Sequence, residues 1–314
     1  MGIGKEGTRG VGVPATFWLP KSNFTFQDRK EDAISEAEYG GIWGYGANGY
    51  VVSRYGEGDI EAELSANSFG LILLATLGTT TPAGPVDSAY THTFTLQNDN
   101  AHDSLSIHVS DPNQDKHYEL AMIDSLKIDV SLKDIVKFTA TFLSKGSMTS
   151  SSTPAYVADY KFTHKYFTLK LASDTSGLNA ATALSVLGFS ITFEKNAELN
   201  QVLGTIQPED IHNKRFNIKG EFTLKYTDET YKDLALAGTT RALRFDLTNT
   251  DNLIGAATCP QFRLDLSKVY LDGWEADRPL DDINVQKLTF VALYDLGNSN
   301  VINSCYLVNS VASY

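Results

Sequence analysis

The chain alternates hydrophobic and polar residues along several stretches. In residues 125–133 every second residue is hydrophobic, and the residues between them are polar or charged. Residues 59–64 and 219–224 show the same pattern. A period of two places alternate side chains on opposite faces of a strand, so one face is buried and the other is polar. The pattern therefore predicts a mainly β protein whose sheets each have one polar face.

The remaining expected elements follow a common order in the two halves of the chain. Each half should contain one short helix, which starts near Asn67 or Ser68, or near Thr227 or Asp228, and ends at Gly78 or Gly238. In the first half we expect strands at 17–19, 24–26, 59–64, 92–96 and 104–109, and one long strand at 125–142. Their expected counterparts are 167–171, 189–193, 219–224, 244–247, 261–266 and 283–294.

A near-repeat supports this correspondence. Leu74–Thr80 reads LATLGTT and Leu234–Thr240 reads LALAGTT, so five of seven letters agree at an offset of 160. Between them, Lys145–Pro154 is a polar run without periodicity, which is typical of a linker. We therefore predict two tandem domains, residues 1–150 and a degenerate second copy at 155–314.

Composition narrows the possible functions. The net charge is −12, and both halves are acidic, with 11 basic against 19 acidic residues in 1–152 and 15 against 19 in 153–314. A protein that grips nucleic acid through phosphates should present a basic patch, and none is visible. No apolar run is long enough to span a bilayer, and no secretory signal is recognisable. Cys259 and Cys305 are interpreted as buried thiols and not as a disulfide framework.

No catalytic or metal-binding pattern stands out. Gly44–Gly49 fits G-x-G-x-x-G, but the strand expected before a dinucleotide fingerprint and the helix expected after it are missing. Asp111–Asp115 resembles the start of a calcium loop, but Lys116 and Met122 occupy two positions that such a loop needs for Gly and Glu, which favours a turn. The six histidines are scattered. The sequence predicts a protein that is not an enzyme, with no cofactor and no metal.

The chain resembles a known family. The opening KEGTRGVGVPATFWLP, the strand Phe24–Phe26, the stretch Gly58–Gly78 and the strand Tyr90–Phe94 resemble the tail tube proteins of long-tailed bacteriophages, in their two-domain form. The resemblance implies two tandem β-sandwich or barrel domains, each flanked by one short helix. It also implies a structural role in the virion tail, after assembly in the host cytoplasm.

The resemblance further implies how copies assemble. Two-domain tail tube proteins are expected to form homotrimeric, pseudo-hexameric rings, which stack around a tape-measure protein and meet tail-end proteins. DNA would pass through the tube during ejection without specific binding, and no membrane is involved. An acidic lumen would repel phosphates. The candidate lumen residues lie on alternating stretches of the chain: Asp59, Glu61, Glu63, Lys127 and Asp129.

Contacts between rings are assigned to long connections. Residues 27–49 form a stretch without a predicted strand, rich in acidic residues and then in glycine and aromatics, and we expect it to reach the neighbouring ring. Residues 194–215 would play a related role in the second half. The candidate inter-ring residues are Glu31, Asp32, Glu36, Ile42, Trp43, Tyr45, Ile206 and Ile211.

A second interpretation remains open at this point. A secreted carbohydrate-binding or adhesin-type β-sandwich could use the 15 tyrosines and 3 tryptophans as stacking surface. Rings or tubes of the purified protein would distinguish the two interpretations.

Overall fold

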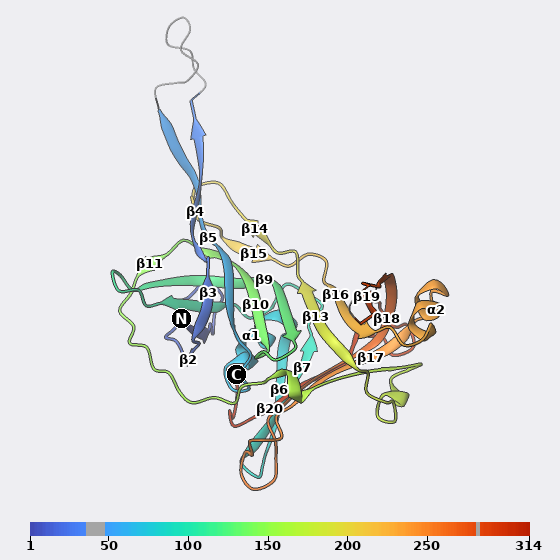
Figure 1. Ribbon diagram of the computed structural model, residues 1–314. Coiled ribbons are helices and arrows are strands. Elements are labelled where there is room, and N and C mark those ends of the chain that lie inside the picture. Colours follow the sequence, from blue (N-terminus) through green and yellow to red (C-terminus); the bar gives the residue numbers. More distant parts are fainter. Residues whose placement is uncertain (36–47, 281–282) are drawn as a thin grey trace, which may run out of the picture.

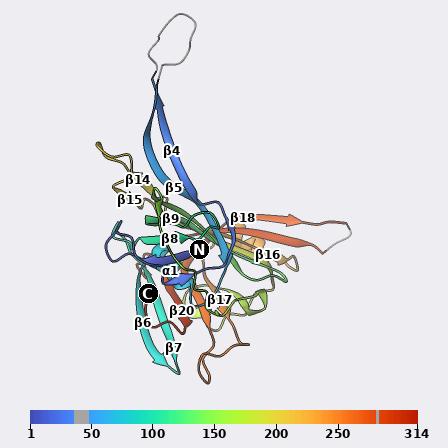
Figure 2. The same cartoon turned by 90° about the vertical axis from the view of Figure 1, so that its left-hand side faces the viewer.

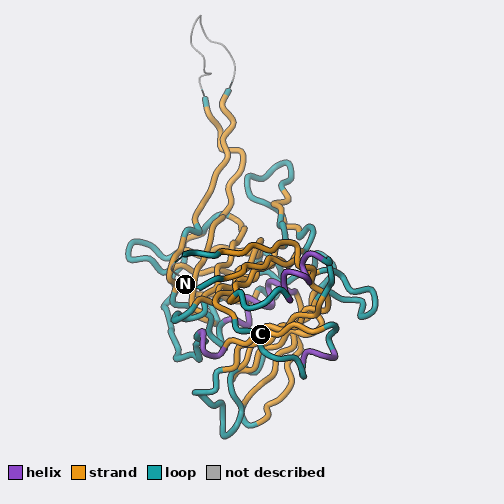
Figure 3. Tube along the Cα trace, turned by 45° about the vertical axis from the view of Figure 1, so that its right-hand side comes forward, coloured by secondary structure: helices purple, strands orange, loops and turns teal. Residues whose placement is uncertain are grey.

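The computed structural model describes residues 1–35, 48–280 and 283–314, and strands dominate it (Figures 1 and 3). In the first half the strands are β1 (Gly2–Lys5), β2 (Phe17–Trp18), β3 (Lys21–Phe24), β4 (Gln27–Ile34), β5 (Gly49–Glu63), β6 (Gly78–Val86), β7 (Ala89–Leu96), β8 (Leu105–Val109), β9 (Lys116–Ser131), β10 (Lys137–Lys145) and β11 (Met148–Thr149). In the second half they are β12 (Phe167–Ala172), β13 (Val186–Glu194), β14 (Glu198–Asn200), β15 (Asp210–His212), β16 (Asn217–Lys225), β17 (Arg241–Thr248), β18 (Gln261–Asp277), β19 (Val285–Ala292) and β20 (Ile302–Asn309). The helices are α1 (Phe69–Leu77) and α2 (Thr230–Leu236), with 3-10 turns at His164–Tyr166 and Ser176–Leu178.

One antiparallel sheet runs through both halves. Its strand order is β4–β5–β10–β9–β13–β16–β19–β18, and β3 also pairs with β5. The halves meet where β9 pairs with β13, from Ser131 opposite Gly188 to Ser125 opposite Glu194. The linker therefore joins two halves of the chain that already share a sheet.

Two further layers are built from the long strands β9 and β18. The first parts of these strands leave the shared sheet and pair elsewhere: β9 with β8 and β11, and β18 with β17 and β20. The first-half layer runs β2–β1–β8–β9–β11, and the second-half layer runs β12–β17–β18–β20–β7–β6. The hairpin β6–β7 belongs to the first half in sequence but extends the layer of the second.

The same pairing scheme occurs in both halves. The first-half pairings β1–β8, β8–β9, β9–β11, β9–β10, β5–β10 and β3–β5 match β12–β17, β17–β18, β18–β20, β18–β19, β16–β19 and β13–β16 in turn. In this scheme β17 corresponds to β8, whereas the sequence analysis matched residues 244–247 with residues 92–96, which lie in β7. That match was wrong because the hairpin β6–β7 has no counterpart among the described residues of the second half and shifts the order of strands by one.

A second sequence expectation was also wrong. Residues 125–142 do not form one strand, because β9 ends at Ser131 and β10 begins at Lys137. The chain turns through Lys133, whose φ is +62°, and Asp134, whose carboxylate accepts the backbone N–H of Ile135. The hydrophobic alternation continues on both sides of this turn, so periodicity did not reveal it.

The two helices end where the sequence predicts, but they differ in burial. Gly78 and Gly238 follow α1 and α2 with φ of +101° and +63°, a region that glycine enters without steric cost. Every residue of α1 is buried, because FGLILLATL is hydrophobic on all sides, whereas α2 has no buried residue. The hydrophobic core that contains α1 includes residues from both halves.

The start of α1 is stabilised by Asp159, which lies between β11 and the 3-10 turn at His164–Tyr166. The Asp159 carboxylate accepts the backbone N–H groups of Asn67 and Ser68 and the Ser68 hydroxyl, at 2.9–3.0 Å. Ser68 occupies the N-cap position, but its side chain makes no capping bond to the helix. The expected capping residue is therefore replaced by a carboxylate about 90 positions away, which local sequence could not indicate.

Candidate functional site

The sequence-predicted lumen residues lie on one face of the shared sheet. Cross-strand pairing places them in rows that continue into the second half. The first row is Glu63, Lys137, Asp129, Ser190, Glu221 and Thr289. The second row is Glu61, Thr139, Lys127, Thr192 and Lys219. The third row is Asp59, Thr141, Ser125, Glu194 and Asn217.

The opposite face of the same strands is hydrophobic. Ile60, Phe138, Ile128, Ile191 and Phe222 are at most 1% exposed and belong to the main core. The period of two that separates these side chains from the polar rows therefore orients the rows away from the core. The structure brings together the five candidate lumen residues, which come from β5 and β9.

The polar face carries partly compensated charge. Lys127 pairs with Asp129 at 2.9 Å, and Lys219 pairs with Glu194 at 2.9 Å. Glu63 pairs with Lys161, which lies between β11 and β12. Asp59 and Glu61 have no ion-pair partner within residues 1–35, 48–280 and 283–314, although Asp59 accepts the Thr141 hydroxyl at 2.7 Å. Two acidic side chains without an ion-pair partner therefore lie on the polar face of β5, as the alternating sequence pattern predicts.

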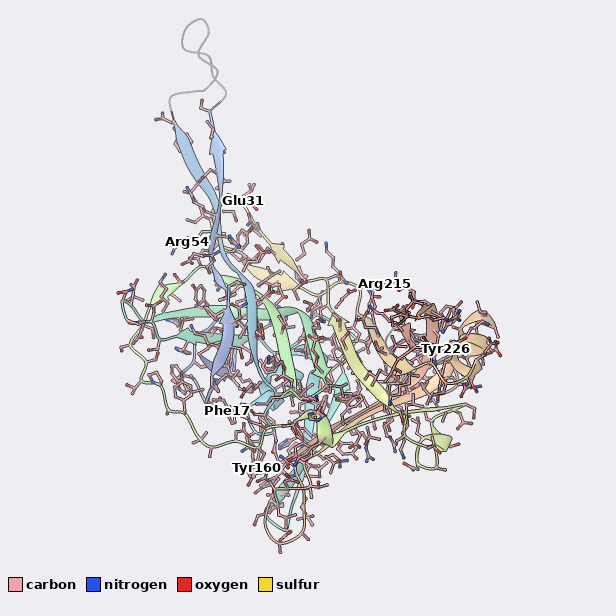
Figure 4. The ribbon with its side chains drawn as sticks, viewed as in Figure 1. Phe17, Glu31, Arg54, Tyr160, Arg215 and Tyr226 are labelled. Carbon is pink, nitrogen blue, oxygen red and sulfur yellow. The ribbon has the colours of Figure 1, made fainter. Side chains whose placement is uncertain are left out.

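A long hairpin of β4 and β5, called the arm below, projects from the body (Figures 1 and 2). Its strands pair from Gln27 opposite Glu57 to Ile34 opposite Gly49. Figure 4 shows Glu31 and Arg54 on it. The sequence indicated a connection without strands, but residues 27–34 form β4 and Gly49 begins β5. Most residues of this region are polar, so no hydrophobic alternation marks the strands.

The arm exposes hydrophobic side chains near its outer end. Ile34, Tyr50, Val51 and Val52 are 44–61% exposed. Glu31 and Asp32 are exposed on β4, and Asp32 pairs with Lys30 at 2.8 Å. Glu36, Ile42, Trp43 and Tyr45 lie outside the described residues.

A second-half loop braces the arm. The backbone N–H of Arg54 donates to the Ile206 carbonyl at 2.7 Å, and the Gln201 side chain donates to the Ser53 hydroxyl. The Ile206 side chain is 48% exposed beside this contact. Residues 201–206 therefore hold the arm where it leaves the body.

The expected role of Ile211 was wrong. Its side chain is fully buried and packs with Leu120 and Met122 of β9, so it anchors the β14–β15 hairpin to the body. A side chain enclosed in this way cannot contact another ring.

Two strand edges of the shared sheet are open within the described parts of the chain. Residues 271–277 of β18 pair only with β19, and residues 21–24 of β3 pair only with β5. The backbone N–H of Thr25 points to β5 and donates to the backbone carbonyl of Asp59. The backbone N–H of Phe24 instead donates to the side-chain Oδ1 of Asn23. These edges are the two ends of one sheet, and sequence reasoning did not identify them.

The described residues contain no group of three or more His, Cys, Asp or Glu side chains placed to hold a metal ion. Asp111–Asp115 lies in the turn between β8 and β9, as expected. Burial raises the pKa of the Cys305 thiol, but Cys259 is only half-buried, which corrects the expectation of two buried thiols. Among the helices that the structure describes, none is long and apolar enough to cross a membrane.

A charged sheet face, open strand edges and a projecting arm with exposed hydrophobic residues define a structural protein that assembles with other copies. Comparison with protein families agrees: the model for phage tail tube proteins matches residues 1–287, and the chain belongs to this family. It is therefore a structural subunit of a phage tail tube, a component of the virion tail. No match was found among curated proteins. The family assignment supports assembly over carbohydrate binding.

Proposed function

We propose that residues 1–150 and 155–314 are two copies of one domain, and that three chains form each ring of the tube. The repeated pairing scheme carries this proposal. Within one chain, β9 of the first domain pairs with β13 of the second. If the domains alternate around a ring, the equivalent junction joins β18 of one chain to β3 of the next. Those are the two open edges.

The pairings also supply the register of this junction. The offset of 160 matches Glu61 with Glu221. Since Glu61 lies opposite Asn23 and Glu221 lies opposite Ser190, Asn23 corresponds to Ser190.

The other side of the junction follows in the same way. On one side, Lys137 and Lys287 lie opposite positions of β5 and β16 that the offset of 160 makes equivalent. On the other side, Lys137 lies opposite Asp129 and Lys287 lies opposite Glu275. Asp129 therefore corresponds to Glu275. Because Asp129 pairs with Ser190 inside the chain, Glu275 should pair with Asn23 of the next chain.

Closing both edges would turn the shared sheet into a barrel. With eight strands from each chain and the hydrophobic face against the core, the polar rows would line the interior. Asp59 and Glu61 would then face the passing DNA, and their charge would prevent the phosphate contacts that hold DNA on a protein. Tape-measure and tail-end proteins would meet this tube, which assembles in the host cytoplasm. The arm would join successive rings.

Reversing the unpaired lumen charges tests the conduit. Asp59→Lys with Glu61→Lys is expected to make assembled protein retain DNA at low salt, with an affinity that falls steeply as salt rises, by a log–log slope of about 0.9 per phosphate contact. The control is Glu229→Lys with Asp233→Lys at the N-terminus of α2, an equal charge change at a helix that contacts β18 near Trp274 and not the polar rows. Fluorescence anisotropy of labelled DNA measures both. Equal retention by the two variants, or none by the first despite assembly, contradicts a lumen position.

A further inference from the structure

A cavity of about 730 Å³, with both polar and apolar side chains in its lining, lies between the two halves of the chain. Its lining comes from the β7–β8 connection, from Lys195 after β13, from residues 213–216 and from the β19–β20 connection. The polar rows, the arm and the strand edges contribute nothing to it. The contacts proposed between chains therefore do not account for this cavity.

Lys195 is a buried cation at this cavity. It is 1% exposed, and its Nζ donates to the Ala75 carbonyl in the last turn of α1 at 2.7 Å. Nζ also lies 3.2 Å from Nδ1 of His102. His102 Nε2 lies 2.9 Å from the Gln97 carbonyl, which can only accept, so Nε2 carries the proton and Nδ1 accepts from Lys195.

No carboxylate pairs with Lys195 in the part of the chain that the structure describes. A buried charge without a counterion is energetically costly, so burial favours the neutral form of the amine and lowers its pKa. Burial, followed by the nearby Arg9 guanidinium, lowers the pKa of Lys195 to about 7, although Asp124 opposes this shift. Burial and Lys195 lower the pKa of His102 to about 4, so the imidazole is neutral at neutral pH.

Other groups at the cavity also lack partners. Both side-chain polar atoms of Asn213 are buried without a hydrogen bond. Arg215, labelled in Figure 4, lines the cavity and has no ion-pair partner within the described ranges, whereas Lys214 pairs with Glu198. The single acid of the lining, Asp99, already accepts from Gln97 and Ala101. Basic side chains therefore outnumber acidic ones around the cavity.

We propose that this cavity binds a small oxyanion of the sulfate or phosphate type, held by the Lys195 ammonium, the Asn213 amide and the Arg215 guanidinium. The anion supplies the counterion that Lys195 lacks and hydrogen-bond acceptors for the orphaned amide. The three residues that hold the anion belong to the second half of the chain, whereas the wall of the cavity comes from both halves. The bound anion therefore stabilises the contact between the halves. The site does not depend on ring formation.

Sulfate is the probe, since it does not titrate near neutral pH. Isothermal titration calorimetry of the full chain at pH about 6, with chloride at equal ionic strength as reference, should show saturable binding at one site per chain. Lys195→Met should abolish it, and Arg215→Gln should weaken it at least tenfold. Lys137→Met, which removes a lysine from the polar face of the sheet, is the matched control and should bind as the unchanged chain does.

The pH dependence gives a second readout. Above the Lys195 pKa of about 7 the ammonium is lost, so binding should weaken about tenfold per pH unit. The other charged groups near the ammonium are Arg9, Asp124, Lys214 and Arg215, and the His102 imidazole beside it is neutral. Absence of saturable binding overturns the proposal. Sulfate binding that is unchanged in Arg215→Gln, or that does not depend on pH, also overturns it. These two tests remain valid even if Lys195→Met fails to fold.

Discussion

Replacing residues 31–53 by an Asn-Gly turn is expected to give soluble rings that do not stack into tubes. Lys30 and Arg54 are opposed across the arm, and an Asn-Gly turn closes such an antiparallel pair. The replacement removes the exposed hydrophobic residues of the arm, each of which contributes about 1.5–3 kcal/mol when fully buried. Negative-stain electron microscopy would show single rings in place of tubes.

A milder variant separates loss of contact from loss of length. Tyr50→Ser with Val52→Ser keeps the arm but removes two side chains that are 61% and 45% exposed. Its control is Leu236→Ser with Val157→Ser, which removes two side chains that are 72% and 73% exposed away from the arm. The arm variant should shorten tubes and the control should not. Tubes of normal length from the 31–53 replacement would refute an inter-ring role.

Phe24→Pro is expected to prevent ring closure where Phe24→Ala permits it. Both variants remove the same aromatic ring, so they lose the same packing inside the chain. Only proline removes the backbone N–H that faces the open edge of β3. One lost ladder bond costs about 1 kcal/mol, and three junctions per ring bring the difference to about 3 kcal/mol, or roughly a hundredfold in the assembly constant.

Mass photometry over a dilution series would compare the two variants. Circular dichroism should first show that both keep the fold of the chain. Equal ring fractions for Phe24→Pro and Phe24→Ala would mean that the β3 edge is not part of the junction.

Local patterns in the sequence predicted the strand-rich fold and the ends of both helices. Alternation places side chains on faces whatever the partner strand is, so Asp59, Glu61, Glu63, Lys127 and Asp129 could be assigned to a polar face before the sheet was known. Gly78 and Gly238 mark helix ends because the backbone there needs positive φ.

Pairing between distant strands was not predictable from one sequence. The junction of β9 with β13, the open edges of β3 and β18, and the Asp159 contact with α1 all join residues far apart in the chain. The buried Lys195 gave no signal, because a single lysine after a strand is ordinarily solvated. Its burial depends on α1, about 120 positions away.

Cross-linking across the proposed junction tests the central claim most directly. Asn23→Cys with Glu275→Cys, in a chain carrying Cys259→Ser, would place two thiols on directly opposed residues. Such residues in antiparallel strands lie about 4.5–5.5 Å apart between Cα atoms, within the range that a disulfide spans. Mild oxidation should give a ladder that ends at a covalent trimer on non-reducing gels, and each single-cysteine variant should give none. Failure of the pair to cross-link in assembled rings, or a ladder that extends beyond three chains, would contradict a ring of three chains joined through β3 and β18.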